Sequence, residues 1–359
     1  MKALRWHGNK DVRLDDIPEP QVKPGWVKIK NGWAGICGSD LHEYLIGPKN
    51  VPFNKPHVLT GETIPTTIGH EWSGTIVELG SDIPDSYGLK VGQKCVVFPV
   101  LGDRNCVYCV EELHGACPNW GFLGYSGFGG GFAEYCCIDA REVLPIPDSM
   151  GLDVGALVEP LAVAWHAIKR SSVKPSDAVL VMGAGPIGIA VILGLQAQGV
   201  TNIAVSEISE LRSEHARNNG VRHVFNPQKD DIRQRTLDIS PDGCGVAVVY
   251  ECTGVQAAME AAIQSVRGGG TIVNIGIFEK PLTLDWNLLN RKSLNYLGSN
   301  IYTKGEFQEV IDAIADGRLK NPERMITSRI SLDEGLEKGF HALLHEREKH
   351  VKILIGVDS

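Results

Sequence analysis

The stretch VLVMGAGPIG at residues 179–188 decides the fold of this 359-residue chain. A short apolar run, typical of a buried strand, leads into the pattern G-x-G-x-x-G, and an apolar helical pattern starts at Pro186. Glycines between a strand and a helix are often only turn residues. Inside a strand–helix–strand unit, however, they let the backbone approach a pyrophosphate, which the helix N-terminus stabilises. We therefore expect dinucleotide contacts at Gly183, Gly185, Pro186, Ile187 and Gly188.

The residues that follow continue the same alternation. We expect strands at 202–207, 246–250, 271–277 and 294–298, with helices at 186–198, 209–218 and 255–266. This order predicts a doubly wound parallel sheet, the Rossmann arrangement. Glu207 ends the second strand, where a carboxylate accepts hydrogen bonds from the adenosine ribose and repels a 2′-phosphate, so NAD is favoured over NADP. Arg212 is expected either to stack on adenine or to be a solvated helix residue.

The two ends of the chain have a different pattern. Residues 1–148 are rich in Gly and Pro and carry short alternating runs, such as residues 27–30 and 91–97, which predict a β-rich domain. The tail predicts helices at 307–315 and 332–344 and a strand at 351–355 that rejoins this first domain. We therefore expect a catalytic domain at 1–155 and 301–359, interrupted by a nucleotide-binding domain at 156–300.

Composition excludes several classes of function. The formal net charge of −8 argues against a nucleic-acid partner, and basic runs are too short for an anionic membrane surface. No apolar run approaches the ~18 residues that cross a bilayer. The N-terminus lacks the apolar segment of a signal peptide, and the 9 cysteines are an odd number without a disulfide framework. A cytosolic protein with reduced thiols is expected.

Two further motifs supply the ligand types of a catalytic zinc site. CGSDLH at residues 37–42 provides a thiolate from Cys37, and GHE at residues 69–71 provides an imidazole from His70 and a carboxylate from Glu71. The first motif also carries Ser39 and His42, a hydroxyl and an imidazole able to move a proton. With the nucleotide motif, this set indicates oxidation of an alcohol by a metal and a nicotinamide.

These segments resemble the zinc-dependent medium-chain alcohol and polyol dehydrogenases along nearly the whole chain. CGSDLH resembles the first ligand segment of the family, GHEWSG at 69–74 the second, and ALVEPL at 156–161 the third. Within the family the chain most resembles the (R,R)-butanediol dehydrogenases, through EYLIGP at 43–48, GFLG at 121–124 and GGGFAE at 129–134. The resemblance implies a GroES-like β-rich catalytic domain beside a Rossmann domain, and a homodimer or homotetramer, with residues 294–298 a possible contact.

The resemblance also implies roles at the zinc. Cys37 and His70 would be ligands, Asp40 would orient His70, and Glu71 or Glu159 would supply a carboxylate. Zinc with one thiolate, one imidazole and one carboxylate is neutral, whereas both glutamates would make the site anionic and oppose an alkoxide. We therefore expect one glutamate on the metal and the other beside it, leaving open which is which.

A vicinal diol or other secondary alcohol is the expected substrate. The zinc would lower the pKa of its hydroxyl, a proton would leave through Ser39 and the cofactor ribose to His42, and a hydride would pass to NAD. Two alternatives stay open: a polyol dehydrogenase of the sorbitol or xylitol kind, and a non-catalytic NAD-binding protein. The combination of Cys37, Ser39, His42 and His70 disfavours the second alternative.

A second metal site is expected near the middle of the first domain. Cys106, Cys109 and Cys117 resemble the structural zinc lobe of the same family, which ordinarily has four cysteines. Asp103 stands where the first cysteine is expected, and an aspartate can also ligate zinc. A metal-free lobe with reduced cysteines is the alternative.

Overall fold

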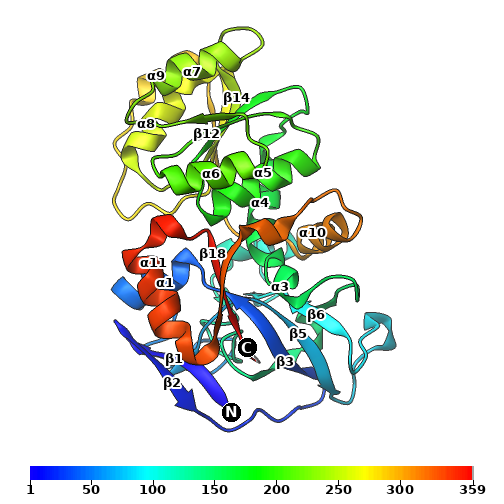
Figure 1. The fold of residues 1–359 in the computed structure, drawn as a ribbon. Coiled ribbons are helices and arrows are strands. Elements are labelled where there is room, and N and C mark those ends of the chain that lie inside the picture. Colours follow the sequence, from blue (N-terminus) through cyan, green and yellow to red (C-terminus); the bar gives the residue numbers. More distant parts are fainter. Residues whose placement is uncertain (358–359) are drawn as a thin grey trace. The chain divides into compact units, whose positions relative to one another are not determined.

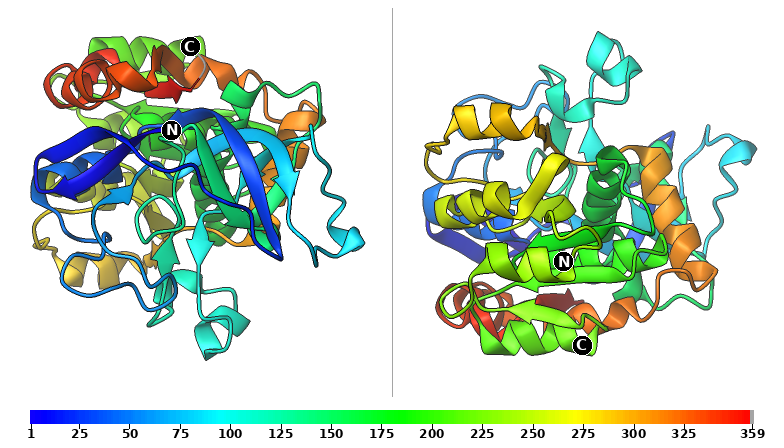
Figure 2. Two further views of the ribbon diagram at one scale, coloured as in Figure 1. Left: turned by 90° about the horizontal axis from the view of Figure 1, so that it is seen from below. Right: turned by 90° about the horizontal axis from the view of Figure 1, so that it is seen from above.

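The computed structural model describes residues 1–357. The chain folds into two compact units: Met1–Glu159 with Thr303–Ala315 and Ile326–Ser359 form the first, and Pro160–Tyr302 with Asp316–Met325 form the second. Residues 316–325, which the sequence pattern put in the catalytic domain, lie with the second unit, because the 3₁₀ helix η4 (Pro322–Met325) packs on α5 (Pro186–Ala197). Figure 1 shows the ribbon, and Figure 2 lets residues after 300, in orange and red, be followed from two further sides.

The second unit is built on a six-stranded parallel sheet in the order β13-β12-β11-β14-β15-β16. The strands span Ala178–Met182 (β11), Asn202–Ser206 (β12), His223–Phe225 (β13), Val246–Glu251 (β14), Val266–Asn274 (β15) and Asn295–Gly298 (β16). The order reverses between β11 and β14, so this is the predicted doubly wound Rossmann sheet. The predicted strands are confirmed, whereas the sequence pattern did not indicate β13.

Helices cover both faces of this sheet, with α5 and α6 on one face and α7 and α8 on the other (Figure 1). The helices are α4 (Val158–Ser171), α5, α6 (Glu210–Asn218), α7 (Ile232–Ile239), α8 (Gln256–Ser265) and α9 (Trp286–Lys292). The core between them includes Leu180, Val249 and Met259. Although α5 is apolar over most of its length, no helix within residues 1–357 is both long and apolar enough to cross a membrane.

The first unit is β-rich, as predicted, and its main sheet runs β10-β6-β5-β3-β18-β17, with β9 also pairing with β3. Its strands are β3 (Trp26–Gly35), β5 (Glu71–Leu79), β6 (Lys94–Val97), β9 (Tyr135–Asp139), β10 (Val143–Pro145), β17 (Ile326–Ser331) and β18 (Lys352–Gly356). The terminal strand β18 pairs antiparallel with β3, which confirms that the chain end rejoins the first unit.

Smaller sheets and short helices complete this unit. One sheet joins β1 (Lys2–Gly8), β2 (Asp11–Asp16) and β4 (Thr66–Thr67), and another joins β7 (Val100–Leu101) and β8 (Gly121–Phe122). The α-helices are α1 (Gly38–Ile46), α2 (Val107–Val110), α3 (Leu152–Gly155), α10 (Lys304–Ala315) and α11 (Ala342–His345).

The helix predicted at residues 332–344 is not a continuous α-helix in the structure. It consists of a 3₁₀ turn at Leu332–Glu334, a π-helix at Gly335–His341, and the single turn of α11. A Cβ at Gly335 would lie 2.4 Å from Leu4 Cδ1, and one at Gly339 would lie 2.6 Å from Ile36 Cδ1. The two glycines bring the helix backbone close to the core, a contact that the helical periodicity of the sequence does not reveal.

Candidate active site and metal centres

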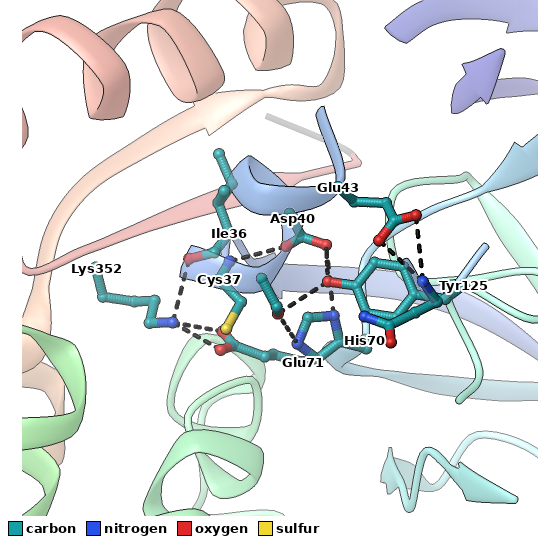
Figure 3. A network of polar contacts seen from close by, with 10 residues as sticks. Ile36, Cys37, Asp40, Glu43, His70, Glu71, Tyr125 and Lys352 are labelled. Carbon is teal, nitrogen blue, oxygen red and sulfur yellow. Dashed lines mark hydrogen bonds and ion pairs between the residues drawn. The ribbon is translucent and has the colours of Figure 1, made fainter. Parts of the chain in front are cut away.

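Three of the predicted zinc ligands come together in the first unit (Figure 3). The thiol of Cys37, a ring nitrogen of His70 and a carboxylate oxygen of Glu71 lie within 4.8 Å of one another. Cys37 follows β3 and is the N-cap of α1, while His70 and Glu71 stand at the start of β5, which pairs with β3. A thiol, an imidazole and a carboxylate at this spacing fit a zinc ion.

Asp40 holds the two residues in place. Its Oδ2 accepts a 2.8 Å hydrogen bond from the Cys37 backbone N–H, and its Oδ1 lies 3.4 Å from His70 Nδ1. Burial alone would lower the pKa of His70, but the Asp40 carboxylate and the Cys37 thiol raise it well above its ordinary value. When a carboxylate engages one ring nitrogen of a ligand histidine, the other ring nitrogen is left for the metal. Here Asp40 lies next to Nδ1, so Nε2 is left for the metal.

A buried lysine lies beside this group and was missed by sequence reasoning. Lys352 Nζ is 2.6 Å from Glu71 Oε2 and 2.8 Å from Glu71 Oε1, and it also donates to the Ile36 carbonyl at 3.2 Å. The two side chains come from β18 and β5, which flank β3 on either side. They meet over Gly35, where a Cβ would lie 2.0 Å from Glu71 Oε2.

Lys352 changes the charge balance that the sequence suggested. Burial lowers its pKa, but Glu71 and Cys37 outweigh burial and hold the pKa above its ordinary value, so the lysine is cationic. When the positive charge of Lys352 is counted, the sum over zinc, one thiolate, two carboxylates and this lysine is again formally zero. The charge argument against binding both glutamates was therefore incomplete.

The other predicted catalytic residues lie in the same unit. Glu159 is 5% exposed, stands in the first turn of α4, and its charge acts on Lys352. Among the described residues it is not part of the ligand group formed by Cys37, His70 and Glu71. Ser39 Oγ lies 3.5 Å from His70 Nε2, and His42 is half-buried one turn further along α1.

The sequence also gave no indication of Tyr125. Its hydroxyl lies 2.9 Å from Ser39 Oγ and 2.8 Å from Asp40 Oδ1, and its ring centroid is 4.9 Å from that of His70 (Figure 3). Tyr125 belongs to the loop after β8, far from these residues in sequence, so no local pattern could have found it. Lys352 could have been found from the sequence, because it is a lysine within an otherwise apolar terminal strand.

The predicted second metal site is also assembled. Ligand atoms of Asp103, Cys106, Cys109 and Cys117 lie within 4.8 Å of one another. A Cβ at Gly102 would lie 2.7 Å from Cys109 Sγ, so this glycine leaves room for the cluster. One carboxylate and three thiols at this spacing fit a closed structural zinc site.

Backbone and side-chain donors fix Asp103 in this lobe. Its Oδ1 accepts from the backbone N–H groups of Asn105 and Cys106, each at 3.0 Å, and its Oδ2 accepts from Asn119 Nδ2 at 3.1 Å. The Cys106 and Asn105 bonds lower the pKa of Asp103, so the group is a carboxylate. Burial, with the neighbouring thiols, raises the pKa of Cys109 to about 12, a value that a bound cation would lower.

The glycine motif of the second unit has the geometry that a pyrophosphate needs. Gly183 has φ +92°, and a Cβ at Gly188 would lie 1.9 Å from the Gly183 carbonyl oxygen. Gly185 is the N-cap of α5, Pro186 and Ile187 form its first turn, and no side chain among the described residues caps this helix start. The helix N-terminus is thus left for an anion.

Glu207 and Arg212 lie next to this turn. Glu207 is 6% exposed, and its carboxylate accepts from the Ala184 N–H at 2.7 Å and from the Ser209 N–H at 2.8 Å. Arg212 Nη1 is the atom nearest to a Cβ built on Gly185, at 3.7 Å. Both predicted side chains are therefore at the glycine turn, and the set fits a dinucleotide.

Comparison with known proteins agrees with this geometry. Residues 23–148 match the model of the alcohol dehydrogenase GroES-like domain, and residues 186–316 match the zinc-binding dehydrogenase model. The chain is 41% identical to the (R,R)-butanediol dehydrogenase of Bacillus subtilis, over 99% of each chain. The chain belongs to the zinc-binding dehydrogenase family. The predicted fold class and family are thus confirmed.

Other members are similar over the same extent. The crystal structure of 2R,3R-butanediol dehydrogenase from Bacillus subtilis has a TM-score of 0.90, at 40% identity and 99% coverage of both chains. The sorbitol dehydrogenase of Bacillus subtilis is 30% identical over 97% of this chain and 95% of its own length. A putative zinc-binding dehydrogenase from Sinorhizobium meliloti, bound to NADP, has a TM-score of 0.84 at 28% identity, covering 99% of this chain and 98% of its own. The present chain is therefore a dehydrogenase of this zinc-binding family.

Proposed function

We propose that this zinc-binding dehydrogenase oxidises vicinal diols and related secondary alcohols to hydroxyketones, and catalyses the reverse reduction, with 2,3-butanediol and acetoin as the substrate type. The observation that carries the proposal is the group formed by Cys37, His70 and Glu71, with Ser39 next to His70. The full-length similarity to a butanediol dehydrogenase supports the choice of substrate.

Cys37, His70 and Glu71 would hold the catalytic zinc, with Asp40 orienting His70. When bound, zinc acts as a Lewis acid that lowers the pKa of the substrate hydroxyl. Lys352 holds Glu71 by both carboxylate oxygens and balances its charge inside the buried site. Glu159 would then be the second carboxylate and would accept a hydrogen bond from the second hydroxyl of a diol.

The proton released from the substrate would leave through hydroxyl groups. Ser39 would accept it and pass a proton to the ribose of the cofactor, and His42 would take it from there. A bound nicotinamide would supply the acceptor for the hydride of the carbinol carbon. Asp103, Cys106, Cys109 and Cys117 would hold a second, structural zinc that takes no part in this chemistry.

NAD is proposed over NADP. The Glu207 carboxylate is buried at the glycine turn and accepts from the Ala184 N–H, so a 2′-phosphate would meet a negative charge there. Arg212 Nη1 lies 3.7 Å from a Cβ built on Gly185, and adenine would stack on this side chain.

We also propose a homo-oligomer assembled through β16. This strand is at the edge of the six-stranded sheet, and its Tyr296 side chain is 39% exposed. An apolar sheet edge of this kind favours pairing with a second copy. A cytosolic location stays a prediction.

A substrate screen with both nucleotides tests the proposal. The zinc-loaded protein is expected to reduce NAD with a 2,3-butanediol isomer and to oxidise NADH with acetoin, at higher kcat/KM than with sorbitol, xylitol or threonine. Faster turnover of sorbitol or xylitol would favour the polyol alternative. Tight NAD binding with no NADH formed from any secondary alcohol would favour a non-catalytic protein.

A further inference from the structure

A buried carboxylate lies at the centre of the parallel sheet and has no role in the chemistry proposed above. Glu251 is the last residue of β14, is 0% exposed, and is in register with Met182, the residue before the glycine motif. The strand order reverses between β11 and β14, and a dinucleotide binds outside the carboxyl ends of the strands at such a reversal. Glu251 therefore lies where the cofactor is expected to cross from one half of the sheet to the other.

Hydrogen bonds fix this carboxylate in the turn after β14. Its Oε1 accepts from the Thr253 backbone N–H at 2.8 Å and from the Thr253 hydroxyl, and the Gly254 N–H lies 3.2 and 3.1 Å from the two oxygens. A Cβ at Gly183, in the glycine motif, would lie 2.8 Å from Thr253 Cγ2, and one at Gly276, after β15, would lie 2.6 Å from Glu251 Oε2. The turn is thus packed against the ends of both neighbouring strands.

The Glu251 carboxylate has hydrogen-bond donors but no cation as partner. Within residues 1–357 it accepts from the Thr253 and Gly254 groups, and no Lys, Arg or His side chain pairs with it. Burial raises the pKa of Glu251, although the same hydrogen bonds oppose the rise. They satisfy the ionised form, whereas the hydrogen of a carboxylic acid would find no acceptor among these donors. A buried carboxylate without a cation is costly, and a cationic ligand would reduce that cost.

The two redox forms of a nicotinamide cofactor differ in the charge of one ring. The nicotinamide is cationic in NAD and neutral in NADH, whereas the adenine, the riboses and the pyrophosphate are the same in both. The glycine motif and Glu207 assign the adenosine half of the cofactor to the β11–β13 half of the sheet. The nicotinamide half is then expected on the β14–β16 half, to which Glu251 belongs.

We propose that the Glu251 carboxylate sets the relative affinity for the two redox forms, so that NAD binds more tightly relative to NADH than it would without this charge. The inference rests on the proposed function only in taking a nicotinamide dinucleotide as the ligand. An electrostatic effect of this kind acts through the field of the site and needs no contact with the ring. Glu207 is proposed to distinguish NAD from NADP, whereas Glu251 distinguishes the oxidised from the reduced cofactor.

Binding titrations with the two nucleotides measure this effect without turnover. The Kd of NAD and the Kd of NADH are each determined by calorimetry on the zinc-loaded full chain, with no alcohol or ketone present. Glu251→Gln is expected to raise the ratio of the NAD Kd to the NADH Kd by about three- to tenfold, the size of a charge interaction over several ångströms in a protein site. A general loss of affinity cancels from this ratio. An unchanged ratio would overturn the proposal.

Three further variants separate the charge of Glu251 from its structural role. Glu251→Asp keeps the charge but is too short to reach the same donors, so both affinities should fall while the ratio stays near that of the wild type. Glu251→Ala should raise the ratio as Glu251→Gln does, so the test does not depend on the folding of one variant. Glu260→Gln is the matched control and should leave the ratio unchanged, because Glu260 is an exposed acid of α8 bonded to Gln256 Nε2, at 2.7 Å.

The outcomes of these titrations are distinct from a failure of the proposed function. An equal change of the ratio in Glu251→Asp and Glu251→Gln would give Glu251 a merely structural role and would contradict the inference. Because binding is measured without turnover, a failure to oxidise diols would refute the proposed function alone.

Discussion

Lys352 Nζ lies 2.6 and 2.8 Å from the two carboxylate oxygens of Glu71, and both side chains are 1% exposed. The pair spans β3 at Gly35, where a Cβ would lie 2.0 Å from Glu71 Oε2. A buried ion pair is costly to form, and removing one partner leaves an uncompensated charge. The charge of Lys352 is thus part of the proposed zinc site.

Lys352→Met tests this role. In chelator-treated protein the free energy of unfolding is expected to fall by about 3–5 kcal/mol, because Glu71 stays buried without its partner. Urea denaturation measures the change. The Lys352→Met/Glu71→Gln double variant should recover most of the loss, and no recovery would argue against a charge effect.

The matched control is Lys338→Met, because Lys338 pairs with Glu334 at 2.5 Å on the surface, with side chains 66% and 37% exposed. This substitution should lower the free energy of unfolding by less than about 1 kcal/mol.

The contribution of Lys352 to stability depends on pH with a fixed sign. Since the folded-state pKa of Lys352 is raised above 10.5, its stabilisation is fully present below pH 10.5 and is lost as the pH rises through the folded-state value.

Cys37→Ser separates the two metal sites. The variant is expected to lose the catalytic zinc and diol oxidation while the lobe of Cys106, Cys109 and Cys117 keeps its metal, so zinc per chain falls from two to one. Metal analysis and NADH formation measure both effects. Cys244→Ser, at an exposed cysteine, should change neither. Full zinc content in Cys37→Ser would contradict the ligand assignment.

Two substitutions of Asp103 are expected to change the rate of zinc release from the second site in opposite directions. Asp103→Ala should speed release of the structural zinc to a chelator, since three thiolates remain, whereas Asp103→Cys should slow it, because a fourth thiolate is a stronger zinc ligand. A zinc indicator dye follows the release. Glu112→Ala, at a neighbouring exposed acid, serves as control. Equal release from all variants and the wild type would support a metal-free lobe.

The cofactor preference is expected to depend on Glu207. Glu207→Ser removes the negative charge at the glycine turn, so the ratio of kcat/KM for NAD to that for NADP should fall by about tenfold or more, through weaker NAD binding and tolerance of the 2′-phosphate. Glu210→Ser, at an exposed acid that pairs with Arg217, should leave the ratio unchanged. An unchanged ratio in Glu207→Ser would remove the physical basis for preferring NAD.

His42→Ala tests the proton path through its pH profile. Without the imidazole the proton has no good acceptor at low pH, whereas hydroxide takes it at high pH. Diol oxidation should therefore slow chiefly on the acidic side, by about 100-fold, at the lower end of the range for general acid–base catalysis. An identical profile in the variant and the wild type would rule out the assignment.

Local sequence signals were sufficient for much of the fold and for the cluster of three candidate ligands. The glycine motif predicted β11 and α5 because strand, turn and helix follow one another directly, and CGSDLH and GHE supplied the three residues that the structure groups together. The resemblance to the family's structural zinc lobe, with Asp103 in the place of a cysteine, predicted the clustering of Asp103 with the three cysteines. Short elements such as β13, with only partly buried side chains, carry too little pattern to be recognised.

The residues that sequence reasoning missed act through contacts between distant segments. Lys352 and Glu71 are 281 positions apart, and Tyr125 and Asp40 are 85 apart. Their meeting depends on strand order and on glycines such as Gly35 and Gly124, which allow close approach. The charge count that the sequence motifs allowed at the proposed zinc site was therefore incomplete. It lacked the positive charge of Lys352, which comes from the last strand of the chain.

The most direct test compares zinc-free and zinc-loaded full-length protein in the oxidation of 2,3-butanediol by NAD. Activity is expected to disappear when the site of Cys37, His70 and Glu71 is emptied by a chelator, and to return in proportion to zinc added back to it. NAD binding, measured in parallel, should persist in both forms. Equal rates of NADH formation by the zinc-free and the zinc-loaded protein would contradict the account.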